Sequence, residues 1–435
     1  MKLSVIGCGY LGAVHASAMA SIGHDVVGID VDALKIEKLS TGKSPFFEPG
    51  LDELLSEGLA TGRLRFSTEM SDAADATVHF IGVGTPQVAG KDNADLRYVY
   101  AAIESLLTVL KPDDLVVGKS TVPVGTAAEL AVKIRPSGAR LLWNPEFLRE
   151  GFAVQDTLRP DRVVYGVESA RENAPEVAKL DDVYAPVLAG GMRRLVMNLP
   201  TAELVKVSAN AFLATKISFI NAMAEISEVV GADVTQLADA IGADDRIGRK
   251  FLNAGIGFGG GCLPKDIRAF AARAGELGVG DAVGFLREVD QINLRRRQRV
   301  VDLVVQSQGG DVTGEKVAVL GLAFKPNSDD VRDSPAVDVA SKLSLLGASV
   351  TATDPEAIEN SRRLLPGVEF VPGPADAVVD ARVVVVATEW KLFKDFEPPQ
   401  VAKEEERLVI DARNCLRAET WTSAGWKYVA LGKSA

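Results

Sequence analysis

The chain begins with a short apolar run that ends in a glycine-rich turn. Residues 2–7 predict a strand, the residues that follow to about Ile22 predict a helix, and Gly7, Gly9 and Gly12 between them fit G-x-G-x-x-G. In such a turn the first glycine permits the tight bend, the second admits a pyrophosphate to the backbone, and the third lets helix and strand pack closely. This order of elements favours a parallel α/β fold that binds a dinucleotide.

The end of the next predicted strand, residues 24–30, indicates which dinucleotide. Asp30 ends this strand at the usual distance for a carboxylate that binds the ribose, and Val31 and Asp32 follow it. Because this carboxylate would repel a 2′-phosphate, NAD is favoured over NADP. From these residues alone, a glycine turn that merely caps a helix and an FAD-binding relative are the alternatives.

Strands and helices continue to alternate over the first two hundred residues. Apolar runs predict strands at residues 77–83, 114–118, 140–143 and 162–166. Thr85 and Thr121 follow two of these strands. Since ligands bind at the carboxyl ends of parallel strands, we expect both residues to line the same crevice.

A change of pattern near Pro200 marks a second region. Residues 201–230 contain no Pro or Gly and predict one long helix, which is apolar around most of its circumference and ends at Gly231. Such a helix is expected to be buried on several sides, as a spine between two lobes and as part of a dimer interface. Helical segments continue to about Gln308.

The alternation then restarts. Strands are predicted at residues 315–321, 348–354, 382–388, 408–411 and 427–431. The sequence therefore predicts an α/β protein of three domains. We expect an N-terminal Rossmann domain over 1–200, a central long-helix dimerisation domain over 201–308 and a C-terminal Rossmann-like domain over 309–435.

Composition excludes several classes of function. The net charge of −11 argues against general nucleic-acid binding, and charges interrupt every apolar run before it reaches membrane-spanning length. Three cysteines lie far apart, so we expect no disulfide framework, no metal site and a reducing cytoplasm. The start of the chain imitates a secretory signal, but the glycine spacing favours a first strand.

One cysteine stands at the mouth of a glycine loop, just before a predicted helix. Cys262 follows Gly257-Phe-Gly-Gly-Gly261, and Pro264 suits a first helical turn. Backbone N–H groups and the positive helix end would favour the thiolate, and the glycines would let a substrate approach. Together with a hydride acceptor, this thiol suggests oxidation through a covalent sulfur adduct. The alternative, a small buried hydrophobic residue, is the favoured interpretation for Cys8 and Cys415.

Seven motifs in one order resemble the UDP-glucose/GDP-mannose dehydrogenase family, and among its members the UDP-glucose 6-dehydrogenases. The resemblance covers essentially the whole chain. The motifs are Gly7-Cys-Gly-Tyr-Leu-Gly12, Val83-Gly-Thr-Pro86, Ser120-Thr-Val-Pro123, Asn144-Pro-Glu-Phe-Leu-Arg-Glu150, Glu203-Leu-Val-Lys206 with Asn210, Gly257-Phe-Gly-Gly-Gly-Cys262-Leu-Pro-Lys-Asp266, and Gly321-Leu-Ala-Phe-Lys325 with Arg332.

The resemblance implies a four-electron oxidation of UDP-glucose to UDP-glucuronate by two NAD molecules in succession. It makes Cys262 the nucleophile, through a thiohemiacetal and then a thioester. Lys206 and Asn210, four apart on one helix face, would donate hydrogen bonds to the developing oxyanion. The other catalytic candidates are Asp266, to position Lys206 or activate water, Glu146, to activate the hydrolytic water, and Thr121, to hold a substrate hydroxyl or a water.

The resemblance also implies two sets of binding residues and a homodimer. The cofactor set is Gly7, Gly9, Tyr10, Leu11, Gly12, Asp30, Lys35, Thr85, Thr121, Glu150, Lys265 and Arg332. The substrate set is Glu146, Phe147, Leu148, Arg149, Glu150, Lys206, Asn210, Arg246, Asn253, Gly255, Gly257, Phe258, Gly259, Phe324, Lys325 and Arg413. Residues 295–297, three arginines in a row, are expected to form only a solvated helix face.

Other functions stay open at this point. Leu263-Pro264 after the cysteine also occurs in dehydrogenases of GDP-mannose and of UDP-N-acetylhexosamines, so the sugar is less firmly indicated than the chemistry. A two-electron hydroxyacid dehydrogenase on a similar scaffold is a further alternative. A non-catalytic nucleotide sensor is disfavoured, because a sensor does not need a thiol nucleophile.

Overall fold

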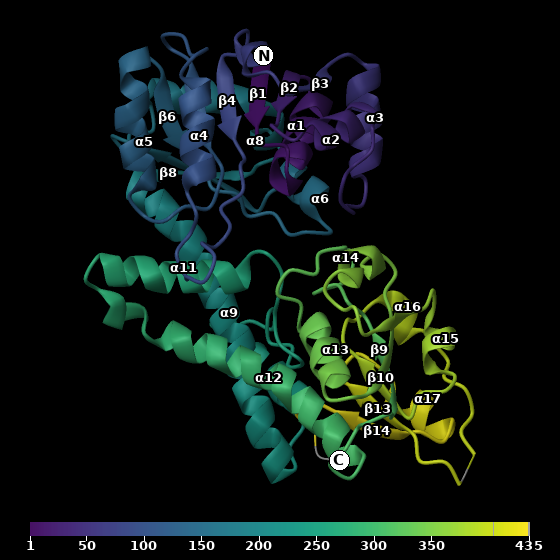
Figure 1. The fold of residues 1–435 in the computed structure, drawn as a ribbon. Helices are drawn as coiled ribbons and strands as arrows, with labels where there is room; N and C mark the ends of the chain where they lie inside the picture. The colour runs from purple at the N-terminus through teal and green to yellow at the C-terminus, as the bar shows by residue number, and fades with distance from the viewer. Residues whose placement is uncertain (403, 434–435) are drawn as a thin grey trace. The chain divides into compact units, whose positions relative to one another are not determined.

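The computed structural model describes residues 1–402 and 404–433 and divides into two compact units. The first unit comprises residues 1–209 and 272–278, and the second comprises 210–271 and 279 onward. Each unit contains a β-sheet with helices packed around it (Figure 1). The expected α/β class is confirmed, while the three domain boundaries stay a prediction.

The sheet of the first unit has the strand order β3-β2-β1-β4-β5-β6-β7-β8. All neighbours are parallel except β6 and β7, which pair antiparallel through Trp143 and Gly166. The sheet therefore departs at this point from the fully parallel arrangement that the alternation predicts. The strands are β1 (Lys2–Ile6), β2 (Asp25–Ile29), β3 (Leu64–Ser67), β4 (Val78–Ile81), β5 (Leu115–Gly118), β6 (Arg140–Trp143), β7 (Arg162–Val167) and β8 (Arg193–Asn198).

Helices flank this sheet and bury its apolar side chains. Helix α1 is almost entirely buried along its length, which places the glycine turn before it at the centre of the unit. The helices are α1 (Tyr10–Ser21), α2 (Ala33–Ser40), α3 (Leu51–Ala60), α4 (Arg97–Leu106), α5 (Thr126–Ile134), α6 (Ala153–Leu158), α7 (Pro175–Val183) and α8 (Ala185–Leu188), with 3₁₀ turns at Met70–Ala73 and Arg135–Ser137.

The long helix α9 (Leu199–Val230) is continuous, as the sequence predicts. It begins in the first unit and continues in the second at Asn210. The second unit also holds the remaining helices of the central region. These are α10 (Val234–Gly242), α11 (Leu263–Glu276), of which residues 272–276 belong to the first unit, and α12 (Phe285–Ser307), preceded by a 3₁₀ turn at Gly280–Val283.

The sheet of the second unit is parallel throughout, in the order β11-β10-β9-β12-β13-β14. Helix α12 packs against α13, which follows the first strand of this sheet. The strands are β9 (Lys316–Leu320), β10 (Ser349–Thr353), β11 (Glu369–Phe370), β12 (Val383–Val386), β13 (Leu408–Asp411) and β14 (Lys427–Ala430). The helices are α13 (Pro335–Leu345), α14 (Ile358–Arg362), α15 (Pro374–Val378), α16 (Lys391–Lys394) and α17 (Ala418–Ser423).

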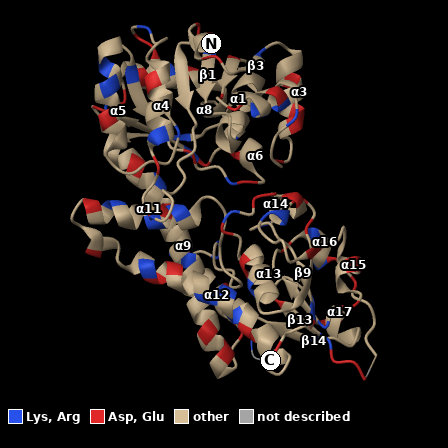
Figure 2. Cartoon of the chain, in the orientation of Figure 1, with Lys and Arg blue, Asp and Glu red and all other residues tan. Residues whose placement is uncertain are grey.

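The central strands of both sheets are apolar and buried, as expected for sheets covered on both faces. Strand β12 is four valines with no exposed surface, and β4 and β5 are buried at every position. Acidic and basic residues are interspersed over the helices and loops of each unit (Figure 2). Within the described residues, none of the helices combines the length and the apolar character needed to cross a bilayer.

Candidate active site

The glycine turn of the first unit has the geometry of a pyrophosphate cradle. Gly7 adopts a left-handed φ of +89°, and a Cβ on Gly12 would lie 1.8 Å from the carbonyl oxygen of Gly7. A Cβ on Gly9 would meet no atom within 4 Å, and no side chain caps the N-terminus of α1. Because this helix end is open and leaves backbone N–H groups for an anion, the turn fits the NAD that the sequence predicts.

Asp30, directly after β2, is held by hydrogen bonds to the surrounding backbone. Its Oδ2 accepts the N–H of Cys8 at 2.8 Å, and its Oδ1 accepts the N–H of Asp32 at 3.0 Å. The ammonium of Lys35 lies 3.0 Å from Oδ2. The structure thus brings together three expected parts of the cofactor site: the glycine turn, Asp30 and Lys35.

Tyr10 ties the glycine turn to the segment that carries the predicted acidic residues. Its hydroxyl donates to the buried Glu48 carboxylate, which also accepts the N–H groups of Gly151 and Ala153, each at 2.7 Å. Burial, reinforced by this hydrogen bond to Glu48, raises the pKa of Tyr10 above its ordinary value. Glu48 was not among the expected residues, since an isolated carboxylate in a loop gives no signal in the sequence.

The two strand ends expected to share a crevice do meet. The hydroxyl of Thr85 donates to the carbonyl of Thr121 at 2.8 Å, and Ser120 donates to the carbonyl of Val83 at 2.7 Å. The parallel pairing of β4 with β5 produces this contact, because both strands end at the same edge of the sheet. Leu11 follows Tyr10 in the first turn of α1, which comes after β1, the strand beside β4.

Glu146 is paired with a buried lysine that sequence reasoning missed. Its Oε2 lies 2.9 Å from the ammonium of Lys119, whose side chain is only 4% exposed. The same ammonium donates to Asn144 at 3.0 Å and Tyr184 at 3.3 Å, which uses its three protons. A lysine directly after the buried strand β5, where apolar residues are expected, is the sequence signal for this support.

The residues after Glu146 occupy different surroundings. The ring of Phe147 has the guanidinium of Arg162 at 4.1 Å and the ammonium of Lys206 at 5.5 Å from its centroid, so two cations lie close to it. Leu148 packs against the apolar core. Glu150 is buried, whereas Arg149 points outward and pairs with Asp156 at 2.7 Å.

Glu203, which belongs to one of the seven motifs but was given no role of its own, fixes the start of α9. Its carboxylate accepts the N–H groups of Gly125 at 2.8 Å and Ala127 at 2.7 Å, at the N-terminus of α5. Burial raises the pKa of Glu203 above its usual value, against these two hydrogen bonds. Lys206 lies three residues further along α9, so Glu203 orients the turn that bears Lys206 relative to the segment after β5.

In the second unit, Cys262 occupies the place that the sequence predicts. It is exposed, and its carbonyl accepts the N–H of Asp266 at 3.0 Å, which puts it at the N-terminus of α11. The carboxylate of Asp266 is almost fully buried; its Oδ2 accepts the amide of Asn210 at 2.6 Å, and Lys265 contacts its Oδ1. The structure therefore joins Asn210 and Asp266, one turn after the thiol.

Packing inside the protein accounts for the glycines that precede Cys262. We expected them to admit a substrate, but each position also lies against a protein atom that a side chain would strike. The nearest atoms to an added Cβ are Ala412 O at 2.6 Å for Gly255, Asn293 Oδ1 at 2.4 Å for Gly257, Asp333 O at 2.3 Å for Gly259, the Phe324 ring at 2.7 Å for Gly260 and the Arg332 guanidinium at 2.3 Å for Gly261.

The remaining expected residues of the second unit divide into anchored and exposed ones. Arg413 donates to the carbonyls of Ala387, Gly257 and Phe324, at 2.8, 2.9 and 3.2 Å, so it ties the end of β13 to the glycine loop. Three others are exposed: Arg246 pairs with Asp244, Asn253 accepts from Arg249, and Arg332 pairs with Asp330. Lys325 is partly buried and lies over the Phe324 ring.

The expectation for residues 295–297 is wrong for two of the three arginines. Arg295 is about half exposed, but the side chain of Arg296 is 0% exposed and pairs with Glu228 at 2.9 Å. Arg297 is also buried and pairs with Asp333 at 2.7 Å. A run of like charges suggests a solvated face, yet α12 is packed on several sides, so successive residues face different partners.

Comparison with known proteins assigns the class. Residues 1–188 match the NAD binding domain of the UDP-glucose/GDP-mannose dehydrogenase family, 200–295 match its central domain and 318–418 match its UDP binding domain. The chain belongs to this family, and the expected cofactor, NAD, and the expected class of substrate, a nucleotide sugar, are confirmed.

Individual relatives are similar over their full length. A UDP-glucose 6-dehydrogenase of Rhizobium meliloti is 42% identical over 100% of both chains. A solved UDP-glucose dehydrogenase of Pyrobaculum islandicum is 38% identical, with a TM-score of 0.90 over 100% of this chain and 98% of its own. A UDP-D-ManNAc dehydrogenase of Pyrococcus horikoshii is 26% identical, with a TM-score of 0.83 over 100% and 99%.

Proposed function

We propose that this protein oxidises the C6 hydroxymethyl group of UDP-glucose to a carboxylate, in two successive NAD-dependent steps, and so produces UDP-glucuronate. The observation that carries the proposal is Cys262, an exposed thiol at the N-terminus of α11 with the buried Asn210–Asp266 pair one turn away. The similarity to UDP-glucose dehydrogenases at 38–42% identity over whole chains supports the choice of sugar.

The cofactor site of the first unit would hold NAD, which supplies the hydride acceptor for both oxidations. The open side of Gly9 and the N–H groups of the first turn of α1 would bind the pyrophosphate, and Asp30 would accept the hydroxyls of the ribose. Lys35 would steady the Asp30 carboxylate. Tyr10, Leu11, Thr85, Thr121 and Glu150 would complete the set in this unit, and Lys265 and Arg332 are the residues of the second unit that the family resemblance adds to the set.

Cys262 would act as a nucleophile after the first oxidation has produced an aldehyde. An electron pair of the sulfur forms a bond to the aldehyde carbon, and the former carbonyl oxygen takes a proton, giving a thiohemiacetal. Loss of a second hydride and the hydroxyl proton gives a thioester. Lys206 and Asn210 would donate hydrogen bonds to the oxygen as charge develops on it, and Asp266 would hold the Asn210 amide in place.

Glu146 would act in the final step, hydrolysis of the thioester. A water molecule gives up a proton to the Glu146 carboxylate while its oxygen bonds to the carbonyl carbon, and the carbon–sulfur bond breaks to return the thiol group. Lys119 would position Glu146, since its ammonium fixes one carboxylate oxygen at 2.9 Å. Thr121 would hold the substrate hydroxyl or this water.

The substrate residues fall into three segments with different chemistry. Phe147, Leu148, Arg149 and Glu150, with Lys206, would contact the sugar from the first unit. Asn253, Gly255, Gly257, Phe258 and Gly259 would face the sugar and phosphates from the glycine loop. Arg246, Lys325 and Arg413 would supply the positive charge that a pyrophosphate needs in an acidic protein, and Phe324 would present its ring beside Lys325.

A homodimer is proposed from an exposed stripe on α9. Phe212, Phe219 and Ile226 recur every seven residues, and Val229 and Val230 extend the stripe; all five are exposed in the single chain. A helix face of this kind is covered by a partner in most soluble proteins, and a second copy supplies an identical stripe. Sedimentation should give a dimer mass that Phe219→Lys halves; a monomeric parent chain would contradict this.

The reducing cytoplasm is the compartment proposed, since Cys262 acts as a thiol.

Counting products tests the reaction. UDP-glucose should yield two NADH for each UDP-glucuronate, whereas a two-electron dehydrogenase would yield one NADH per substrate. Parallel assays with GDP-mannose and UDP-N-acetylmannosamine identify the sugar, and reduction of NAD by either of these but not by UDP-glucose would reject the proposal. Cys262→Ala should bind NAD normally and form no acid; unchanged acid formation would refute the role of the thiol.

A further inference from the structure

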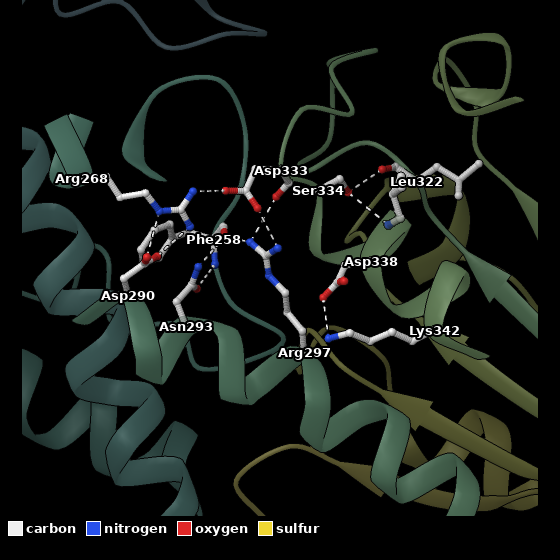
Figure 3. Close-up of polar contacts among 11 residues, drawn as sticks. Phe258, Arg268, Asp290, Asn293, Arg297, Leu322, Asp333, Ser334, Asp338 and Lys342 are labelled. Atoms are coloured by element: carbon white, nitrogen blue, oxygen red, sulfur yellow. Dashed lines mark hydrogen bonds and ion pairs between the residues drawn. The ribbon is translucent and has the colours of Figure 1, made fainter. Parts of the chain in front are cut away.

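Two side chains of α12 hold the backbone of Phe258, four residues before Cys262. The Oδ1 of Asn293 accepts the N–H of Phe258 at 2.7 Å, and its Nδ2 donates to the Phe258 carbonyl at 2.9 Å. Arg297 donates to the same carbonyl at 3.1 Å (Figure 3). Asn293 is fully buried, so the glycine loop is fastened to α12 through groups that water does not loosen.

Asp333 connects this anchor to the other side of Cys262. Its Oδ1 accepts from Arg297 at 2.7 Å, and its Oδ2 accepts at 3.2 Å from Arg268, which lies on α11 six residues after Cys262 (Figure 3). Arg268 also makes two bonds to Asp290 of α12, at 2.8 and 2.9 Å. The segment that carries the thiol is thus fixed before and after Cys262 by one connected set of charges.

These four charged side chains, Arg268, Asp290, Arg297 and Asp333, are suited to holding the segment in place and not to binding an ion. Two arginines face two carboxylates, so their charges cancel, and their side chains are between 4% and 25% exposed. Asp333 adopts a left-handed φ of +47°, a conformation in which only Asp, Asn and Gly are common. A partly buried ion network with good geometry holds one arrangement strongly, because breaking it leaves a charge without a partner.

We propose that Asp333, through Arg297 and Arg268, is the positioning residue for the Cys262 thiol. The inference rests on the proposed role of Cys262 as nucleophile. Asp333 orients the loop and the first turn of α11 so that the sulfur reaches the aldehyde carbon before the aldehyde leaves. A displacement of about 1 Å at a reacting atom costs roughly 100-fold in rate, so a loosened loop lets the aldehyde escape.

The test is Asp333→Asn, which keeps the size and the left-handed backbone but removes the charge that holds both arginines. Aldehyde released from the enzyme is trapped with an aryl hydrazide and measured beside NADH and UDP-glucuronate. We expect acid formation to fall about 10- to 100-fold, trapped aldehyde to appear, and NADH per acid to rise above two. The KM for UDP-glucose and the rate of the first oxidation should change by less than about threefold.

Asp338→Asn is the matched control. It makes the same chemical change on α13, where Asp338 pairs only with Lys342 at 3.0 Å within the network drawn in Figure 3, and its ratio should stay at two. If Asp333→Asn does not fold, Arg268→Gln is used, since it removes the link to Asp333 while an amide can still donate to Asp290. A ratio of two in the variant, whatever its rate, shows a merely structural role and overturns the proposal.

Cys262→Ala separates the two levels of inference. If it forms aldehyde but no acid, the nucleophile stands and the Asp333 result is decisive by itself. If Cys262→Ala still forms acid, the proposed function of the thiol fails, and the positioning role fails with it.

Discussion

The two sheets carry the same turn at the same place and use it differently. Gly7 follows β1 and Gly321 follows β9, both with a left-handed φ, and their N–H groups bond to the carbonyls of Ile29 and Thr353 at 2.7 and 2.8 Å. An added Cβ would strike the second residue after the neighbouring strand in each case, at 2.6 Å from Val83 or 2.5 Å from Thr388. The backbone solution is therefore shared by the two sheets.

The segment after the turn differs between the two sheets. In the first sheet α1 begins at Tyr10, directly after the turn, whereas in the second α13 begins only at Pro335. The intervening loop runs back to the Cys262 segment: the N–H of Gly260 donates to the carbonyl of Arg332 at 2.9 Å. The first turn thus leads directly into a helix with an open N-terminus, whereas the second leads into a loop that bonds to the segment before Cys262.

The carboxylate at the end of the second strand shows the same contrast. Asp30 accepts two backbone N–H groups and one surface ammonium, so it can still receive a ribose hydroxyl. Asp354 is only 2% exposed, and its oxygens accept from the indole of Trp390 and from four backbone N–H groups. A carboxylate that already accepts five hydrogen bonds has a structural role. An Asp at the end of a strand therefore does not by itself identify a ribose site.

Removing these carboxylates should give the largest difference in stability between the two sheets. Asp354→Ala leaves four buried donors and one partly buried donor without an acceptor, at about 1–3 kcal/mol each for groups that cannot relax. We expect the free energy of unfolding to fall by at least about 3 kcal/mol. Urea unfolding followed by fluorescence measures it.

Asp30→Ala is the counterpart in the first sheet. It should cost about 1–2 kcal/mol of stability, and it should weaken NAD binding about tenfold or more, measured by titration calorimetry. Equal losses of stability in the two variants would show that the carboxylates do the same job.

The glycines of the first turn give the next largest effect. In Gly12→Ala the new Cβ would lie 1.8 Å from a carbonyl oxygen, which forces helix and strand apart and should lower stability by about 3 kcal/mol. Gly9→Ala has open space around its Cβ, so it should melt like the parent chain. Its loss should appear only in NAD affinity, and unchanged NAD affinity would contradict the proposal that this face binds the pyrophosphate.

The order of these elements could be predicted from the sequence, and the reasons are local. Period and glycine spacing locate β1, α1 and β2 within about two residues, and the parallel pairing of β4 with β5 follows from strand ends such as Thr85 and Thr121. Strands β3, β8 and β11 were missed. They lie in short or half-exposed segments such as Arg193–Asn198, which lack a continuous apolar run.

The supports of the site were beyond sequence reasoning for a different reason. Lys119, Glu203, Asn293 and Asp333 meet partners 25 to 78 residues away. No periodicity encodes such pairs, because they depend on which elements pack together. Arg297 was misjudged because its neighbours in the sequence, not its neighbours in space, suggested a solvated face.

The smallest expected effect concerns the reactivity of the Cys8 and Cys415 thiols. Burial, with the nearby Asp30, raises the pKa of Cys8 above its ordinary value, and burial with Asp411 does the same for Cys415. A raised pKa keeps both thiols protonated and inert at pH 8. Iodoacetamide at pH 8 should therefore label the exposed Cys262 and neither of the others, as peptide mass spectrometry can check; labelling of Cys8 would show that the first turn opens.

The central claim is that a covalent bond forms between Cys262 and the sugar. The direct measurement is mass spectrometry of the Glu146→Gln protein, quenched in acid after mixing with UDP-glucose and NAD, because hydrolysis of the thioester should then be slow. We expect the mass of a UDP-glucuronyl group on the Cys262 peptide and two NADH per labelled chain. Formation of UDP-glucuronate by the parent enzyme, with no such adduct in the Glu146→Gln protein at any time, would contradict it.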